Sequence, residues 1–305
     1  MLMLSFLPWP LLLVINLILI PLNSIVIATP MTLLGVLRFC LPFKAVLKFI
    51  EKCNAVFYRI WVINNNLAIR LTNKINWHIT GDAIPTVRRS CIVISNHLSW
   101  ADILVISMIY GGKLPITKFF MKHSLIYIPF VGLACYAIGM PFLRRYPKEK
   151  LLKNPQLRNR DIMTTKAACR RLALSPSTLI NFVEGTRYTP PKAKIARSPY
   201  EHLMPPKVAS VAIALGEIGR DIDYVFNTTL SYPHNAYPNK PFIDLLKGRL
   251  TDICADIRRV KVSPELVGDY LNDKNFKHEF TMHMREVWKQ KDETIKSQLK
   301  QLENN

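Results

Sequence analysis

The sequence predicts an α/β domain with a mixed, largely parallel sheet flanked by helices, preceded by an apolar N-terminal segment embedded in a membrane. Segments with strand and helix patterns alternate along most of the chain, which is typical of α/β folds. Two largely apolar runs, 91–95 and 177–183, have the pattern of strands buried on both faces of a parallel sheet. No charged side chain precedes Arg38, which sets the first segment apart.

The uncharged segment 1–37 is long enough to enter a membrane, since about 20 apolar residues cross a bilayer. Four prolines interrupt it, so it either crosses once as a helix or enters and leaves as a proline-broken hairpin. Arg38 and three lysines follow at once, and the positive-inside tendency places the rest of the chain on the cytoplasmic side. We therefore assign residues 1–40 to a membrane-embedded helix or hairpin.

Residues 43–71 have the spacing of an amphipathic helix, with apolar side chains three and four residues apart and basic ones between them. Such a helix either packs on the following domain or contacts the membrane surface, and the two roles are compatible. We assign residues 41–75 to a basic amphipathic helix on the membrane surface. Its apolar positions are Phe43, Val46, Leu47, Ile50, Cys53, Phe57, Ile60 and Trp61.

The rest of the chain alternates between strands and helices. Strands are expected at 76–80, 91–95, 177–183, 224–231 and 251–262, and helices at 102–110, 161–174, 208–215 and 275–302. Residues 126–143 are also uncharged, but prolines and glycines divide them into a short helix and a strand rather than a second membrane span. Residues 188–206, rich in proline and lysine, are expected to form a loop. Residues 76–273 thus form one domain, and residues 274–305 form a charged C-terminal helix.

The formal net charge of +20 indicates an acidic partner, either a nucleic acid or an anionic lipid surface, and the alternative is a charge that serves only solubility. Paired arginines at 170–171 and 258–259 suit nucleic acid, but no recognisable nucleic-acid module accompanies them. A nucleic-acid-binding protein would also have no role for the uncharged segment 1–37. The composition therefore favours a phospholipid membrane as the partner and no nucleic acid.

Cysteines and the remaining histidines give no sign of a disulfide framework or a metal site. The six cysteines have no C-x-x-C pair and lie mostly in apolar stretches, as reduced packing residues do. Six histidines apart from His97 show no ligand spacing, so no metal is expected. The cysteines are Cys40, Cys53, Cys91, Cys135, Cys169 and Cys254, and these histidines are His78, His123, His202, His234, His278 and His283.

His97 and Asp102 follow the strand expected at 91–95 and form the first candidate for chemistry. On one continuous helix, side chains five residues apart point about 140° away from each other, so the two can hydrogen-bond only if His97 precedes the helix. A carboxylate on one imidazole nitrogen leaves the other as a base for a hydroxyl proton. The alternative is a pair of polar residues beside a buried strand.

Residues 184–187 follow the strand expected at 177–183 and form the second candidate. A glycine turn frees backbone amides, and the Arg187 guanidinium can bind phosphate through two parallel hydrogen bonds. The alternative is a plain turn with a local ion pair between Glu184 and Arg187. Sites in open α/β sheets usually lie at the carboxyl ends of parallel strands, so both candidates are expected in one site. Their combination predicts transfer to a hydroxyl of a phosphorylated molecule.

Four motifs in order resemble the glycerolipid acyltransferase family, which includes 1-acyl-glycerol-3-phosphate and lysophospholipid acyltransferases. They are Asn96-His97-x4-Asp102, Lys122-x2-Leu125-x3-Pro129-x2-Gly132, Gly139-x-Pro141-Phe142-x-Arg144-Arg145 and Phe182-Val183-Glu184-Gly185-Thr186-Arg187. The likeness covers roughly residues 76 to 235. Val183 and Ser99-Trp100 resemble the branch with lysophosphatidylinositol and lysocardiolipin acyltransferases and some bacterial inner-membrane enzymes.

The resemblance implies a glycerol-3-phosphate acyltransferase-like fold for residues 76–273 and a role for each motif residue. His97 removes the proton of the acceptor hydroxyl, which attacks the acyl thioester, and Asp102 orients the imidazole. Arg187, with Gly185 and Thr186, holds the acceptor phosphate. Lys122 and Arg144 assist, Glu184 orients Arg187 or a glycerol hydroxyl, and Asn96 braces the turn that presents His97.

The activity expected from the resemblance is transfer of a fatty acyl group from acyl-CoA or acyl carrier protein, as co-substrate, to a lysophospholipid hydroxyl. The leading acceptor is 1-acyl-glycerol-3-phosphate, which gives phosphatidic acid, and the alternatives are lysophosphatidylinositol, lysophosphatidylglycerol and lysocardiolipin. No cofactor is needed. The expected place is the bacterial inner membrane, with the catalytic domain on the cytoplasmic face. The alternative class is a basic membrane scaffold without activity, which gains nothing from a base beside a phosphate-binding turn.

Overall fold

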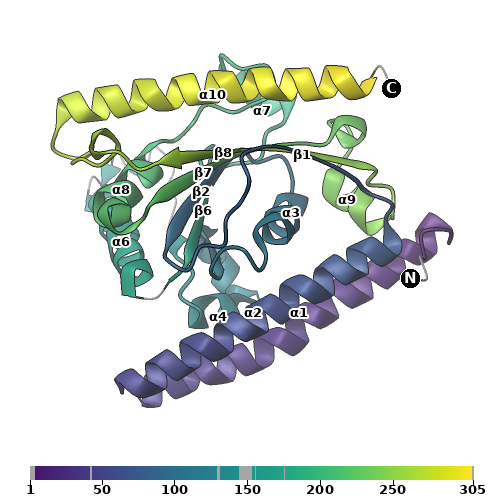
Figure 1. The fold of residues 1–305 in the computed structure, drawn as a ribbon, viewed down its shortest axis with the longest axis horizontal. Helices are drawn as coiled ribbons and strands as arrows, with labels where there is room; N and C mark the ends of the chain where they lie inside the picture. The colour runs from purple at the N-terminus through teal and green to yellow at the C-terminus, as the bar shows by residue number, and fades with distance from the viewer. Residues whose placement is uncertain are drawn as a thin grey trace.

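Two long N-terminal helices lie along one side of an α/β domain, and a long C-terminal helix crosses the opposite side (Figure 1). The computed structural model describes residues 4–41, 43–128, 131–143, 153–154, 156–174 and 176–303. Helix α1 spans Trp9–Cys40 and helix α2 spans Lys44–Thr72, and the two run side by side. The described part of α1 contains a stretch, Trp9–Leu37, that is long and apolar enough to cross a membrane.

Helix α1 is continuous through Pro21 and Pro30, so no proline-broken hairpin forms between Trp9 and Cys40 and that alternative is wrong. Each internal proline removes one backbone hydrogen bond and favours a kink. Packing compensates, because α1 buries Ile27 and Met31 against helix α4 (Val131–Ala137) and against α2. Packing against α2 and α4 therefore keeps α1 continuous despite its two internal prolines.

The central sheet has six strands in the order β1-β8-β7-β2-β6-β3. Strands β7, β2, β6 and β3 are mutually parallel, whereas β8 runs antiparallel to β7 and carries β1 parallel to itself. The prediction of a mixed, largely parallel sheet is therefore confirmed. The bounds are β1 Asn76–Gly81, β2 Cys91–Ser95, β3 Thr117–Phe119, β6 Thr178–Phe182, β7 Tyr224–Ser231 and β8 Asp252–Lys261.

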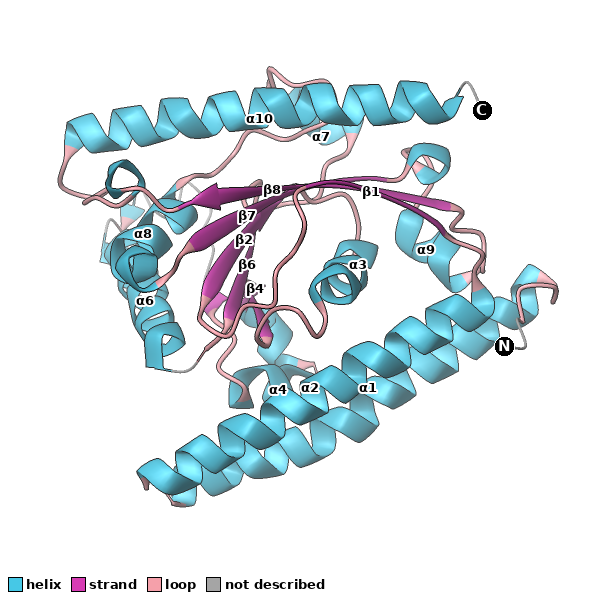
Figure 2. Ribbon diagram, in the orientation of Figure 1, coloured by secondary structure: helices cyan, strands magenta, loops and turns pink. Residues whose placement is uncertain are grey.

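Helices cover both faces of the sheet, as Figure 2 shows. Successive residues of β2 point to opposite faces, so Val93 joins the core under α3 and α9 while Ile92 and Ile94 join the core under α8 and α10. This double burial is the reason that β2 has no polar alternation. The helices of the two layers are α3 Ala101–Tyr110, α9 Pro241–Leu246, α6 Gln156–Leu174, α8 Ala209–Ile218 and α10 Lys274–Glu303.

Several short elements had no distinct sequence pattern. Strands β4 (Met121–Lys122) and β5 (Phe142–Leu143) pair as a separate parallel ribbon, and α7 (Pro190–Ile195) lies inside the segment expected to be a loop. The segment 126–143 contains α4 and β5, as predicted. The 3-10 turns are His123–Tyr127, Gly219–Asp221, Pro233–Asn235 and Pro264–Leu266.

Candidate active site

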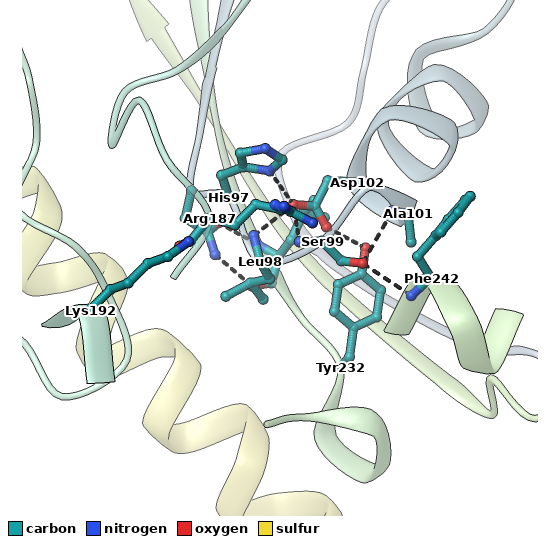
Figure 3. A network of polar contacts seen from close by, with 11 residues as sticks. His97, Leu98, Ser99, Ala101, Asp102, Arg187, Lys192, Tyr232 and Phe242 are labelled. Atoms are coloured by element: carbon teal, nitrogen blue, oxygen red, sulfur yellow. Dashed lines mark hydrogen bonds and ion pairs between the residues drawn. The ribbon is translucent and has the colours of Figure 1, made fainter. Parts of the chain in front are cut away.

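The turn between β2 and α3 holds His97 and Asp102 in direct contact (Figure 3). His97 lies before α3, so its Nδ1 reaches Asp102 Oδ2 at 2.8 Å. The backbone amides of Leu98 and Ser99 donate to the same oxygen at 2.7 and 2.9 Å. The helix start thus wraps its first turn around the carboxylate, which fixes both the carboxylate and the imidazole.

Tyr232, which follows β7, donates its hydroxyl to the second oxygen, Asp102 Oδ1, at 2.8 Å. Both side chains are buried. Burial raises the pKa of the Tyr232 hydroxyl well above its usual range, and the neighbouring Asp102 charge raises it further. The phenol therefore remains a donor, and Asp102 has donors on both of its oxygens.

The His97 imidazole is partly open to solvent, with 15 % of its side chain exposed. It stacks on Phe182, the last residue of β6, with ring centroids 4.1 Å apart. With Nδ1 committed to the carboxylate, Nε2 is the nitrogen that can accept a proton. Asn96, wholly buried, exchanges two hydrogen bonds with the backbone of Leu230, at 2.9 and 2.8 Å, and fixes the turn to β7.

The turn after β6 lies directly against the His97 turn. The Tyr188 amide donates to the His97 carbonyl at 2.7 Å, and the Val183 amide donates to the Ser95 carbonyl at 3.2 Å. Gly185 adopts φ 66°, a left-handed conformation that glycine takes without the strain of a Cβ. The two motifs, distant along the chain, therefore share one edge of the sheet, where parallel strands end.

Arg187 lies beside the His97 turn, with its guanidinium carbon 5.2 Å from the centroid of the Trp100 ring. Figure 3 shows Arg187 alongside His97 and Asp102. The Lys192 ammonium donates to the Arg187 carbonyl at 3.3 Å. A guanidinium and an imidazole thus lie together on one side of the molecule, as transfer to a phosphorylated acceptor requires.

Glu184 is completely buried, and neither of its carboxyl oxygens has a hydrogen-bond partner. It therefore forms no ion pair with Arg187 and presents no surface to a substrate. Burial raises the pKa of its carboxyl well above the usual range, although the nearby amides of Met204 and His97 and the Lys291 charge oppose the rise.

Of the other two candidates, Lys122 has no polar contact with the cluster among the described residues, and Arg144 is not described. Lys122 is exposed on β4. The six cysteines are free, as expected. In the described ranges, no group of three or more His, Cys, Asp or Glu side chains is arranged to hold a metal ion.

Sequence reasoning did not assign a role in the site to Tyr232 or Phe182. Tyr232 is far along the chain from Asp102, which it supports, and no motif marks it. Phe182 belongs to the quoted motif, but its stacking on His97 depends on the pairing of β2 with β6. A strand-end position was the one available clue for Tyr232, because β7 ends beside β2.

The site has the parts of an enzyme that transfers a group to a hydroxyl: a histidine held by a buried carboxylate, next to an arginine, at the ends of parallel strands. Residues 76–222, which include both turns, match the family model described as Acyltransferase. The part of the chain that holds the site is therefore similar to the Acyltransferase family.

Among solved structures, the chain is similar to the 1-acyl-sn-glycerophosphate (LPA) acyltransferase PlsC from Thermotoga maritima. The sequence identity is 17 %, the TM-score is 0.47, and the match covers 95 % of this chain and 97 % of that one. No curated protein sequence gives a significant match.

Proposed function

We propose that this acyltransferase moves a fatty acyl group from acyl-CoA or acyl carrier protein to the free hydroxyl of 1-acyl-glycerol-3-phosphate, giving phosphatidic acid. The observation that carries the proposal is the His97–Asp102 pair lying beside Arg187. A base and a cation in one cluster suit an acceptor that has both a hydroxyl and a phosphate. Other lysophospholipids share these two groups and are the alternative acceptors.

In the proposed reaction, His97 Nε2 takes the proton of the acceptor hydroxyl as its oxygen attacks the thioester carbonyl. The tetrahedral intermediate collapses with cleavage of the carbon–sulfur bond, and the imidazolium returns the proton to the departing thiolate. Asp102 holds the imidazole in the tautomer that leaves Nε2 unprotonated and stabilises the cation formed during transfer. The acyl group passes directly from the thioester sulfur of the donor to the hydroxyl oxygen of the acceptor, so no acyl-enzyme forms.

Arg187 is the proposed ligand of the acceptor phosphate, because a guanidinium pairs with phosphate through two hydrogen bonds. Gly185 and Thr186 lie in the same turn, and we propose that their amides add to the binding. Stacking over Trp100 orients the guanidinium before the acceptor arrives. Lys122 and Arg144 remain proposed helpers from the neighbouring motifs.

We propose that α1 lies along the membrane, with the catalytic domain on the cytoplasmic face of a bacterial inner membrane. Near its N-terminal end, α1 contacts α9 through the buried Asn16, whose amide donates to the Leu246 carbonyl at 2.9 Å. Nearer its C-terminal end, Ile27 and Met31 pack on α4. A helix attached to the domain at both ends suits an in-plane position better than a crossing one.

The test is thiol release from acyl-CoA by the detergent-solubilised full chain with a panel of lysophospholipids, with lipid products read by mass spectrometry. Because general base catalysis contributes about 10²–10⁴-fold, His97→Ala should lower turnover by at least about 100-fold. His283→Ala, which removes an exposed histidine of α10, is the matched control and should leave turnover unchanged. Equal turnover by parent and His97→Ala, or no turnover with any acceptor, would overturn the proposal and leave the scaffold alternative.

Arg187→Ala should raise the acceptor KM more than it lowers kcat, because a phosphate contact made in both ground and transition states contributes uniform binding. The loss of a charged hydrogen-bond donor, worth about 1.5–3 kcal/mol, corresponds to roughly a 10- to 100-fold change. The acyl-CoA KM serves as the internal control and should stay unchanged. An unaltered acceptor KM would contradict the role given to Arg187.

A further inference from the structure

The N-terminal end of α1 gathers two cations around one aromatic ring. Trp9, the first residue of α1, is 41 % exposed. The Lys247 ammonium lies 4.7 Å from the centroid of the Trp9 ring, and the Arg249 guanidinium carbon lies 5.0 Å from it. The indole attracts each cation, but two cations held close to one ring repel each other. The cluster of Trp9, Lys247 and Arg249 therefore attracts an anion.

The loop that carries both cations is fixed against the two N-terminal helices. Gly248 adopts φ 68°, and a Cβ at this position would collide with the Leu12 side chain and the Thr72 carbonyl. The backbone of the loop therefore touches α1 and α2 directly. The Asn73 side-chain amide, directly after α2, donates to the Leu245 carbonyl at 3.0 Å, just before the loop. The fold thus sets the place from which both cations reach Trp9.

Neither cation is neutralised by a carboxylate in the part of the chain that the structure describes. The acidic side chains nearest to them along the chain have other partners. Asp244 accepts the side-chain amide of Asn235 at 3.1 Å. Asp252 lies between His78 and His234, and each histidine has a ring nitrogen 2.9 Å from a carboxyl oxygen. The positive charge beside the indole is therefore available to an external anion.

Exposed apolar side chains flank the cluster in the sequence. Phe6 and Leu11, on either side of Trp9, are 75 % and 52 % exposed. Tryptophan and basic side chains next to exposed apolar ones are typical of the level at which the headgroups of a bilayer meet its acyl chains. A nucleic acid would leave these apolar side chains in water. The combination therefore favours an anionic phospholipid as the source of the anion.

We propose that Trp9, Lys247 and Arg249 form a binding site for the headgroup of an anionic phospholipid, which attaches the N-terminal end of α1 to the bilayer surface. The inference rests on the proposed position of α1 along the membrane, and it adds the charge of the lipid and the residues that bind it. The Arg249 guanidinium suits two hydrogen bonds to the phosphate, and the Lys247 ammonium adds a point charge. A zwitterionic headgroup brings its own cation and gains less.

The proposed headgroup site lies one short helix away from the His97–Asp102 pair. Helix α9 begins at the active-site turn, where the Phe242 amide donates to the Ser99 hydroxyl at 3.0 Å (Figure 3). The same helix ends at Leu246, directly before the loop with the two cations. A lipid bound there therefore sets the distance between the active-site edge and the bilayer that contains the proposed acceptor.

The experiment measures flotation of the full chain, diluted from detergent, with vesicles of phosphatidylcholine alone and of phosphatidylcholine mixed with phosphatidylglycerol. In the double variant Lys247→Gln, Arg249→Gln, the partition coefficient on the anionic vesicles should fall about 30-fold, because each cation at an anionic surface contributes about fivefold. Binding to the neutral vesicles should change little. The melting temperature should stay the same, because neither side chain is buried.

The matched control is the double variant Lys277→Gln, Arg285→Gln, which removes one exposed lysine and one exposed arginine from α10, across the domain from α1. It should bind both kinds of vesicle like the parent. The exchange Lys247→Arg, Arg249→Lys keeps both charges and should retain most of the preference for anionic vesicles. An equal loss in the first double variant and the control would mean that charge acts diffusely, and it would overturn the inference.

Flotation needs no turnover, so failure of the proposed acyl transfer leaves its result valid. A parent that binds both kinds of vesicle alike contradicts the headgroup site alone, whereas a parent that binds neither also contradicts the proposed position of α1. A filter-binding assay with RNA tests the alternative occupant. If Lys247→Gln, Arg249→Gln loses RNA binding but keeps the preference for anionic vesicles, the site is one for nucleic acid and the inference is wrong.

Discussion

Asp102 is the residue on which the geometry of the site depends, because it accepts hydrogen bonds from four donors. They are His97 Nδ1, the amides of Leu98 and Ser99, and the Tyr232 hydroxyl. A carboxylate accepts hydrogen bonds at both of its oxygens. The side-chain amide of asparagine accepts at its oxygen and donates from its nitrogen. This difference allows the orienting role of Asp102 to be separated from simple packing.

Asp102→Asn should lower kcat by at least about 100-fold, because the amide group favours the imidazole tautomer with its proton on Nε2 and so removes the base. Tyr232→Phe keeps the carboxylate and three of its donors, so it should cost about 1.5–3 kcal/mol of stability and only a few-fold in kcat. The measurement is steady-state kinetics of both variants, together with their melting temperatures. Similar kcat values for the two would mean that Asp102 supports the turn without orienting His97.

At the same scale, the sequence identified the residues of the motifs but not those that hold them. His97, Asp102 and Arg187 were expected together because each follows a buried strand, and strand ends meet at one edge. Tyr232 reaches Asp102 from the end of the neighbouring strand β7, and the distance along the chain gives no guide to that contact. The burial of Glu184 was also not predictable, since a charged residue in a turn is usually exposed.

At the scale of elements, hydrophobic pattern decided what could be predicted. Strand β2 and helix α10 are long enough to show their patterns, and in α10 the buried Phe280, Met284, Trp288 and Ile295 recur at helical spacing. Strands β3, β4 and β5 have two or three residues each, too few for any period. The continuity of α1 through its prolines depends on contacts with α2 and α4. Those contacts cannot be predicted from the sequence of α1 alone.

The sheet topology also required three-dimensional information. The pattern of β8 predicted a strand but not its direction, and β8 reverses the sheet by pairing antiparallel with β7. That reversal also sets the direction of β1, which pairs parallel with β8. Only the four strands β3, β6, β2 and β7 keep the parallel order that brings the two turns of the active site together.

For the whole molecule, the proposed membrane surface follows from the side chains that α1 and α2 leave uncovered. In α1, Leu11, Leu22 and Leu33 are spaced by eleven residues and lie on one face, and more than half of each is exposed. In α2, Phe49 and Val56 are exposed in the same manner. Large apolar side chains left exposed along both helices mark an interaction site, and a lipid bilayer suits a face with no polar pattern.

Replacing Leu11, Leu22 and Leu33 together with alanine should weaken binding to phospholipid vesicles. Each loses about 2 kcal/mol of apolar burial, since a buried methylene is worth about 0.8 kcal/mol, so the partition coefficient should fall at least about 100-fold. The matched control is Ile195→Ala in α7, because Ile195 is 84 % exposed and α7 lies toward the side of the domain opposite to α1 and α2.

Vesicle flotation with anionic and with neutral lipids provides the measurement. Because the charge of +20 adds an attraction that salt screens, the parent should bind anionic vesicles better at low ionic strength, and the triple variant should keep this salt dependence while losing apolar affinity. If Ile195→Ala weakens binding as much as the triple variant does, or if the triple variant binds like the parent, the membrane surface lies elsewhere. The active-site edge would then need another route to the proposed lipid acceptor.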